Sequence, residues 1–218
     1  MKNGKLFLGG GGDADTSFDF DEQFFFELPR QASLLYIPIA LRRESIGYEA
    51  CIDWFSALVA RHSEGKEIDF ETALENIRVT SLDKFDAVYI GGGNTYHLLD
   101  YVTEAGMRER LAEYVQGGGS IYGGSAGAIV LGKDIRTVED ENHRGSTHHN
   151  GLNMLGGMSV LCHYQDSMKE HAASLAASLR SPILAIPENS GVIWIGNHIE
   201  RCVGKISEFQ PDGTVGRI

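Results

Sequence analysis

Short runs of apolar residues alternate along the chain with longer stretches in which apolar positions recur every three or four residues. The short runs are typical of buried strands, and the longer stretches are typical of amphipathic helices. The predicted strands cover residues 6–8, 34–37, 87–90, 120–122, 159–162 and 183–186. The predicted helices cover residues 18–28, 45–61, 96–101, 107–115 and 167–179. Because strands that alternate with helices form parallel sheets with helices on both faces, we expect an α/β fold with a mostly parallel sheet.

The pattern changes after Pro187. Strand-like residues 191–195 and 198–203 flank the dipeptide Gly-Asn, and two shorter runs flank a Pro-Asp-Gly turn at residues 211–213. Turns of this composition join antiparallel strands. We therefore expect antiparallel hairpins at the C-terminal edge of the fold.

The length of 218 residues fits one α/β domain, and we expect a single domain over residues 1–218. Nineteen basic residues against 30 acidic ones give a formal net charge of -11, which disfavours binding to nucleic acid or to anionic lipid. No apolar run approaches the roughly 20 residues of a membrane span, and the run at residues 6–8 is too short for a signal peptide. We therefore expect a cytoplasmic protein.

Its cysteines Cys51, Cys162 and Cys202 are far apart and form no CxxC pair, so we expect free thiols.

Three glycine-rich turns follow predicted strands, at the sheet edge where open α/β folds bind ligands. The first, GGGGDA at residues 9–14, formally matches a dinucleotide-binding loop, but the second strand is not followed by the acidic residue that binds a ribose. We expect a tight turn beside the site, with nucleotide binding as the less favoured alternative. The second turn, at residues 91–93, can direct backbone amides at an anion or oxyanion, and Asn94 or Thr95 after it can also cap a helix.

The third turn, at residues 123–127, has the pattern GxSxG between a predicted strand and a helix start. A serine hydroxyl needs a sharp, uncrowded turn beside a base before it can attack a carbonyl, and flanking glycines permit that turn. Ser125 is therefore the candidate nucleophile, and the amide of Ala126 would point toward the oxyanion formed by its attack. A packed strand-to-helix turn without a catalytic role is the alternative.

His163 is the candidate base, because it follows the predicted strand 159–162 and so lies at the same sheet edge as Ser125. Three other histidines lie in a polar stretch that indicates a long loop: His143, His148 and His149. Their spacing suits neither a helix face nor a zincin motif, so a metal site built on them is a less favoured alternative. We expect no metal.

Two carboxylates are candidates for the acid that orients His163. Asp140, with Glu139 and Glu141 beside it, lies in the polar loop and can fold over the sheet edge to complete a triad. Glu188 follows the predicted strand 183–186, so it also lies at the edge where a carboxylate is needed. The residues alone leave this choice open.

Five blocks follow one another along the chain: Gly91 to Thr95 with Leu98 and Leu99, Gly124 to Ala128, Ile135 to Thr137 with Asp140, His163 with Tyr164, and Pro187 with Glu188. In this order and spacing they resemble the serine peptidases that include peptidase E, the aspartyl dipeptidase, and cyanophycinase. The resemblance runs from about Leu6 to Val203. It implies a three-layer α/β/α sandwich of the flavodoxin-like or class I glutamine amidotransferase-like kind, with serine where those amidotransferases have cysteine.

The resemblance also implies a role for each matched position. Ser125 would be the nucleophile, His163 the general base and Asp140 the acid, with Glu188 as the alternative acid. The amides of Gly93 and Ala126 would form the oxyanion hole. Gly92 and Asn94 would line the substrate site.

One departure concerns the substrate. After the histidine, the aspartyl dipeptidases carry an arginine-containing segment that pairs with the acidic side chain of the substrate, whereas residues 164–171 contain no arginine. An acidic side chain in a partly buried pocket needs a cation, and the candidates are Lys169 or, from the loop, Arg136 and Arg144. Aspartyl specificity is therefore left open.

We expect a serine exopeptidase that hydrolyses dipeptides or short peptides through an acyl-enzyme, without a cofactor. The expected partner is a small peptide substrate, with neither nucleic acid nor a membrane, and a homodimer is left open. The alternatives are a cyanophycinase-like or isopeptide hydrolase, an esterase on the same triad, and a catalytically silent amidotransferase-like binding domain.

Overall fold

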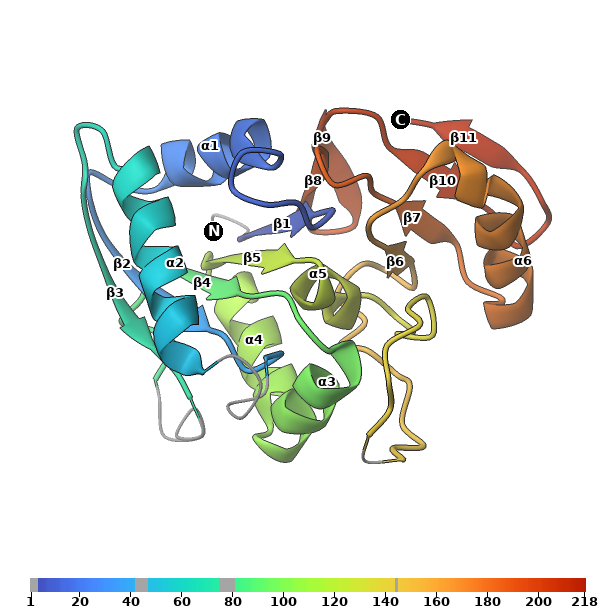
Figure 1. Cartoon of the computed structure of the whole chain (residues 1–218), viewed down its shortest axis with the longest axis horizontal. Coiled ribbons are helices and arrows are strands. Elements are labelled where there is room, and N and C mark those ends of the chain that lie inside the picture. The colour runs from blue at the N-terminus through green and yellow to red at the C-terminus, as the bar shows by residue number, and fades with distance from the viewer. Residues whose placement is uncertain (1–3, 42–46, 75–80, 144) are drawn as a thin grey trace.

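A computed structural model describes residues 4–41, 47–74, 81–143 and 145–218, and in this part of the chain the strands form a large and a small sheet (Figure 1). The large sheet has the order β3-β2-β4-β5-β1-β8-β9. Its strands are β1 (Lys5–Gly9), β2 (Gln31–Ile37), β3 (Glu67–Thr72), β4 (Ala87–Ile90), β5 (Ser120–Gly124), β8 (Gly191–Ile195) and β9 (His198–Val203). The first five of these strands pair in parallel, and β8 and β9 add an antiparallel edge next to β1.

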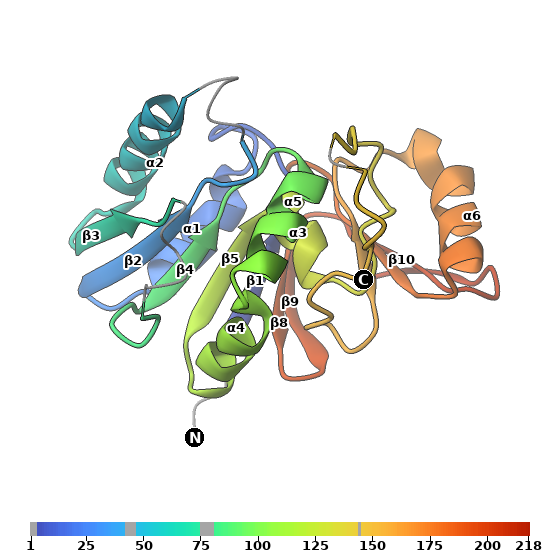
Figure 2. The same cartoon turned by 90° about the horizontal axis from the view of Figure 1, so that it is seen from below.

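Helices cover both faces of the large sheet (Figure 2). One face packs against α1 (Phe18–Glu27) and α2 (Tyr48–His62). The other packs against α3 (Thr95–Glu104), α4 (Met107–Gln116) and α5 (Ala126–Leu131). Alternate strand residues point to opposite faces, so each strand contributes to both cores. The predicted α/β fold with a mostly parallel sheet and C-terminal antiparallel strands is confirmed.

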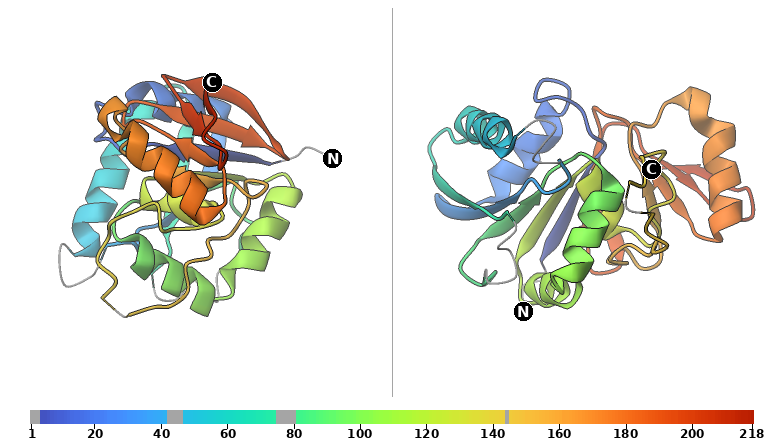
Figure 3. Two further views of the ribbon diagram at one scale, coloured as in Figure 1. Left: turned by 90° about the vertical axis from the view of Figure 1, so that its right-hand side faces the viewer. Right: turned by 60° about the horizontal axis from the view of Figure 1, so that its bottom comes forward.

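The small sheet lies beside the large one, on the right in Figure 1, and has the order β11-β10-β7-β6. Its strands are β6 (Ser159–Leu161), β7 (Ile183–Ala185), β10 (Ser207–Phe209) and β11 (Val215–Arg217). The short helix η2 (Asp166–Met168) leads into α6 (Lys169–Leu179), which packs on this sheet (Figure 3). Strands β6 and β7 pair in parallel, so their carboxyl ends lie side by side.

The sequence pattern did not separate β6 and β7 from the strands of the large sheet, and it missed β3. Strand β3 is a half-exposed edge strand whose residues alternate between exposed and partly buried positions, so it carries no apolar run. The predicted helix start at Ser45 lies outside the described residues, and α2 is described from Tyr48. Among the described residues, no helix is both long and apolar enough to cross a bilayer.

Candidate active site

Ser125 occupies a sharp turn between the end of β5 and the start of α5. Its backbone has φ 49° and ψ -112°, and its amide donates a hydrogen bond to the Gly9 carbonyl at 3.1 Å. The turn depends on its glycines, because a β-carbon on Gly123 would lie 2.6 Å from the carbonyl carbon of Gly127. The GxSxG pattern therefore forms a strained strand-to-helix turn, the geometry that presents the nucleophile in α/β-hydrolases.

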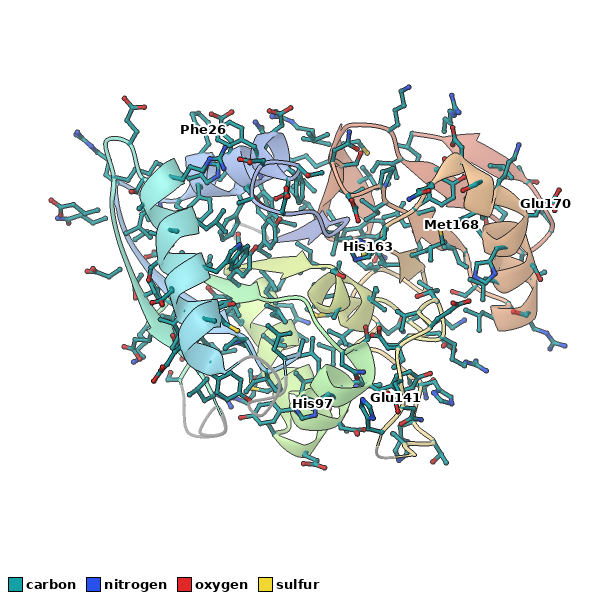
Figure 4. All side chains as sticks on the ribbon, in the orientation of Figure 1. Phe26, His97, Glu141, His163, Met168 and Glu170 are labelled. Atoms are coloured by element: carbon teal, nitrogen blue, oxygen red, sulfur yellow. The ribbon has the colours of Figure 1, made fainter. Side chains whose placement is uncertain are left out.

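His163 lies between the two sheets (Figure 4). Its Nε2 is 2.8 Å from Ser125 Oγ. The backbone holds the ring there, because the His163 amide donates to the Gly10 carbonyl at 2.9 Å and so ties the end of β6 to the end of β1. Among the described residues, four non-glycine residues have positive φ, and this pair accounts for two of them, with His163 at 54°. Backbone strain of this kind concentrates at functional sites, where the surrounding structure maintains it.

Glu188 is the carboxylate that contacts His163. Its Oε1 lies 2.9 Å from His163 Nδ1, and both side chains are about half exposed. The contact follows from the pairing of β6 with β7, which sets Leu161 opposite Ala185 and brings the residues after each strand together. When Nδ1–H of a neutral imidazole donates to a carboxylate, Nε2 is left as an acceptor for the serine hydroxyl. The three side chains therefore form one hydrogen-bonded chain.

Asp140, the other candidate acid, contacts the start of α3. Its Oδ2 accepts a hydrogen bond from the Thr95 amide at 2.7 Å, at the first turn of α3. The polar loop around Asp140 reaches the start of α3 rather than the imidazole, because amide donors at a helix N-terminus attract a carboxylate. Asp140 thus fixes the loop against the second glycine turn.

Asn94 is engaged with the protein on both sides of its amide group. Its Oδ1 caps α3 by accepting from the His97 amide at 2.9 Å, and its Nδ2 donates to the Glu141 carbonyl at 2.9 Å. The expected helix cap is therefore present. The side chain holds the loop in place, so a substrate would meet it only in competition with these bonds.

The second glycine turn and the start of α5 lie beside the serine. The amides on either side of Gly92 and Gly93 are engaged. The Gly91 amide donates a hydrogen bond to the Ile37 carbonyl, and the Asn94 amide donates one to the Ala40 carbonyl. The amides of Gly92 and Gly93 have no acceptor among the described residues. A β-carbon on Gly92 would lie 3.3 Å from that of Ser125, and Ala126 is the first residue of α5, whose initial amides have no partner within the helix. The described structure therefore leaves backbone amides beside Ser125 without an acceptor.

Comparison with known proteins identifies the family. The model of Peptidase family S51 matches residues 6–202. The chain belongs to this family. The predicted membership in the peptidase E group is therefore confirmed.

Curated relatives align with about half of this S51 chain. Peptidase E of Streptomyces coelicolor is 34% identical over 114 residues, which are 52% of this chain and 44% of the relative. An uncharacterized peptidase of Pasteurella multocida is 29% identical over 107 residues, 49% of this chain and 51% of the relative. The chain thus spans about half the length of the curated relatives it matches.

Solved structures match most of the chain. A putative peptidase E from Listeria monocytogenes has a TM-score of 0.71 at 22% identity and covers 92% of this chain and 98% of its own. A peptidase from an acI-B1 actinobacterium has a TM-score of 0.71 at 23% identity and covers 99% of this chain and 94% of its own. These similarities show that the S51 chain has the same fold.

Gly11 is a site residue that the sequence analysis assigned only to a tight turn. Its φ is +91°, and a β-carbon there would lie 2.6 Å from His163 Cε1 and 2.7 Å from Ser125 Cβ. Any side chain at this position would displace one of the two. The sequence signal was the glycine run after the first strand. Such a run indicates that other residues pack close to the backbone there, but it does not show which residues they are.

Two cavities meet at Ser125. The aromatic cavity has a volume of about 340 Å³ and is walled by Tyr36, Trp54, Tyr89 and Tyr122. The loop-side cavity has a volume of about 790 Å³ and is lined by the polar loop, including Glu139 and Asp140, by His163 and by residues at the start of α6. No lysine or arginine is among the described residues that line either cavity.

The cations considered for an acidic substrate are placed as follows. Arg136 forms an ion pair with Asp134, with Nη2 and Oδ2 2.6 Å apart. Burial alone would raise the pKa of the Asp134 carboxyl, but hydrogen bonds from Arg136 outweigh this effect and lower it. Lys169 does not line either cavity, and Arg144 lies outside the described residues.

The histidines of the polar loop do not gather around a common point. His143 Nδ1 is 3.1 Å from Glu141 Oε1, whereas the His149 ring packs edge-on against Tyr96 and its buried Nδ1 has no hydrogen-bond partner in the described part of the chain. Within residues 4–41, 47–74, 81–143 and 145–218, no group of three or more His, Cys, Asp or Glu side chains is arranged to hold a metal ion.

Proposed function

We propose that this chain is a serine exopeptidase that hydrolyses dipeptides or short peptides through an acyl-enzyme. The observation that carries the proposal is the continuous hydrogen-bonded chain from Ser125 Oγ to His163 Nε2, and from His163 Nδ1 to Glu188. Membership in peptidase family S51 supports a peptide as the substrate.

The catalytic cycle uses each member of this chain in turn. His163 Nε2 accepts the proton of Ser125 as the oxygen attacks the scissile carbonyl, and then gives that proton to the leaving amine. Glu188 holds the ring in the required tautomer and stabilises the imidazolium that forms. Water then attacks the acyl-enzyme with His163 again acting as the base, which releases the acid product and restores the serine.

The amides of Gly92, Gly93 and Ala126 are proposed to stabilise the oxyanion. Gly92 and Gly93 each line a cavity together with Ser125, and their amides have no acceptor in the described part of the chain, while Ala126 follows Ser125 at the start of α5. Asp140 and Asn94 are proposed to position the backbone rather than to contact the substrate. Their hydrogen bonds hold the polar loop against the start of α3, where this glycine turn ends.

An acidic substrate side chain is not favoured in either cavity. A carboxylate that leaves water without a cationic partner loses its solvation, and neither cavity offers a lysine or an arginine among its described residues. In the loop-side cavity the carboxyl groups of Glu139 and Asp140 would also repel it. We therefore propose that the enzyme does not select aspartyl peptides.

A panel of dipeptides, short peptides, isopeptides and carboxylic esters tests the proposal. The purified protein is expected to release amino acids from dipeptides, and Ser125→Ala is expected to abolish this release while circular dichroism shows an intact fold. Faster turnover of isopeptides or esters than of any α-peptide would favour another hydrolase on the same triad. Hydrolysis that persists in Ser125→Ala would overturn the proposal.

A further inference from the structure

The aromatic cavity opens onto the nucleophile. Its wall includes Ser125 together with the glycine turns at residues 11–12 and Gly92, so a side chain that enters it belongs to a residue held at the reacting serine. A volume of about 340 Å³ lies at the small end of the range for ligand pockets. The cavity therefore suits a single substrate side chain better than an extended ligand.

The chemistry of the walls favours aromatic or large apolar groups. Besides the tyrosines and Trp54, the wall contains Leu41, Ala50 and Cys51. No carboxylate, ammonium, guanidinium or imidazole is among the described residues that line it. An aromatic side chain would gain both burial of apolar area and ring contacts, whereas a charged one would lose its solvation without a partner.

The tyrosine walls are held rigidly. The rings of Tyr89 and Tyr122 stack with centroids 4.4 Å apart, and Tyr36 stacks on Phe55 at 4.1 Å. The Tyr122 hydroxyl donates to the buried carboxyl of Asp21, and Ser17 Oγ donates to the same carboxyl at 2.7 Å. Since these rings are already fixed, binding of a side chain would carry little entropic cost for ordering them.

Trp54 is part of the cavity wall. It is one of the few large apolar side chains exposed in the described part of the chain, with 40% of its surface accessible. Its ring lies 6.3 Å from that of Tyr89, tilted rather than stacked. Helix α2 therefore presents an exposed indole beside an apolar cavity. Exposed apolar surface of this kind is typical of ligand-binding sites.

We propose that the aromatic cavity binds an aromatic or large apolar side chain next to the scissile bond and so sets the substrate preference of the enzyme. This inference rests on the proposed peptidase function, because it assigns the residue that flanks the bond cleaved at Ser125. The same cavity disfavours aspartyl and glutamyl side chains.

Matched peptides test the cavity. In one series phenylalanine replaces alanine on the acyl side of the scissile bond, and in the other on the leaving-group side. Wild-type kcat/KM is expected to favour phenylalanine by about tenfold or more in one of the two series. Ala50→Leu fills the cavity and is expected to reduce this ratio to near one, and Trp54→Ala is expected to reduce it several-fold.

Ala57→Leu is the matched control. Ala57 is an exposed alanine on the same helix that does not line the cavity, so this variant is expected to keep the wild-type ratio. A ratio near one in both series, a preference for aspartate, or a ratio that survives Ala50→Leu would overturn the inference while leaving the peptidase function intact.

A binding measurement separates this inference from the peptidase function. Calorimetric titration of the Ser125→Ala protein with N-acetylphenylalanine amide is expected to show binding that Ala50→Leu in the same background removes. If that binding is seen and no peptide is hydrolysed by the wild type, the cavity does bind such a side chain, but the peptidase proposal fails, and with it the placement of that side chain beside a scissile bond. Absence of binding at millimolar ligand would count against the cavity.

Discussion

His163 Nδ1 and Glu188 Oε1 lie 2.9 Å apart because β6 and β7 run in parallel and end side by side. This contact depends on strand pairing, whereas an Asp140 contact would have depended on the path of a long loop. It therefore supports Glu188 as the acid of the triad that we propose.

Glu188→Gln is expected to lower kcat by about 10³-fold or more, because the amide can hold the wrong tautomer and cannot stabilise an imidazolium. Proton NMR provides a direct readout. The wild type is expected to show a strongly downfield imidazole N–H resonance, which Glu188→Gln removes.

Asp140→Asn is the comparison for this experiment. Asn keeps an oxygen for the Thr95 amide, so the downfield resonance is expected to persist, and any loss of activity comes from the loop beside the oxyanion turn. A resonance that disappears in Asp140→Asn and persists in Glu188→Gln would reverse the assignment.

Gly11→Ala is expected to reduce kcat/KM by about 100-fold or more, because the new methyl group must push His163 or Ser125 out of alignment. Gly106→Ala is the matched control. Gly106 also has positive φ, at +63°, but a β-carbon there meets nothing within 4 Å. Both variants are expected to lose about 1 kcal/mol of stability from backbone strain. Steady-state kinetics and urea unfolding check the pair, and equal activities would contradict the packing described for Gly11.

Asp21→Asn is expected to change how stability depends on pH. Burial raises the pKa of the Asp21 carboxyl above its ordinary value of 3.8, in spite of hydrogen bonds from Tyr122 and Ser17. The folded chain therefore holds this proton more tightly than the unfolded chain, so the contribution of Asp21 to the free energy of unfolding falls as pH rises above about 3.8.

The Asp21→Asn variant lacks the titrating carboxyl group. Its Tm relative to wild type is expected to rise as the pH increases from about 4 toward neutrality, and then to level off once the folded wild type has also lost the proton. Thermal melts of both proteins across this range measure the difference. A difference that is constant with pH would contradict the burial described for Asp21.

Thiol alkylation is expected to leave activity intact. Cys162 Sγ lies 3.6 Å from the carbonyl oxygen of Ser125, but burial raises the pKa of its thiol and leaves little thiolate near neutral pH. Burial also raises the pKa of Cys51. Iodoacetamide at neutral pH is therefore expected to leave peptide hydrolysis unchanged, with the urea-unfolded protein as the control for labelling. Rapid inactivation with an adduct on Cys162 would show that the thiol takes part.

The strand-to-helix turn at Ser125 could be predicted because its determinants are local. Glycines at both ends of GxSxG and a strand before it are enough to predict a turn that presents the serine. His163 could be placed at a strand end for the same reason. The contact between the two side chains was expected, and Ser125 Oγ lies 2.8 Å from His163 Nε2. What the sequence pattern did not show is that His163 follows a strand of a second sheet, tied to the first by the hydrogen bond from the His163 amide to the Gly10 carbonyl.

The choice between Asp140 and Glu188 lay beyond the sequence pattern. Strands β6 and β7 have three residues each, too few to specify a partner by their side chains, and so the second sheet was not anticipated. The long loop carrying Asp140 has many available paths, and the amides at the start of α3 determine the one taken. The aromatic cavity could not be predicted from the sequence either, because its walls come from β2, β4, β5 and α2 together.

The most direct test of the account is labelling with a fluorophosphonate, which reacts with a serine oxygen activated by a neighbouring base. Mass spectrometry of the labelled, folded protein is expected to find one adduct on the peptide that contains Ser125, formed far more slowly in His163→Ala and in Glu188→Gln. Absence of an adduct on Ser125, or an adduct that forms at the same rate without His163, would contradict it.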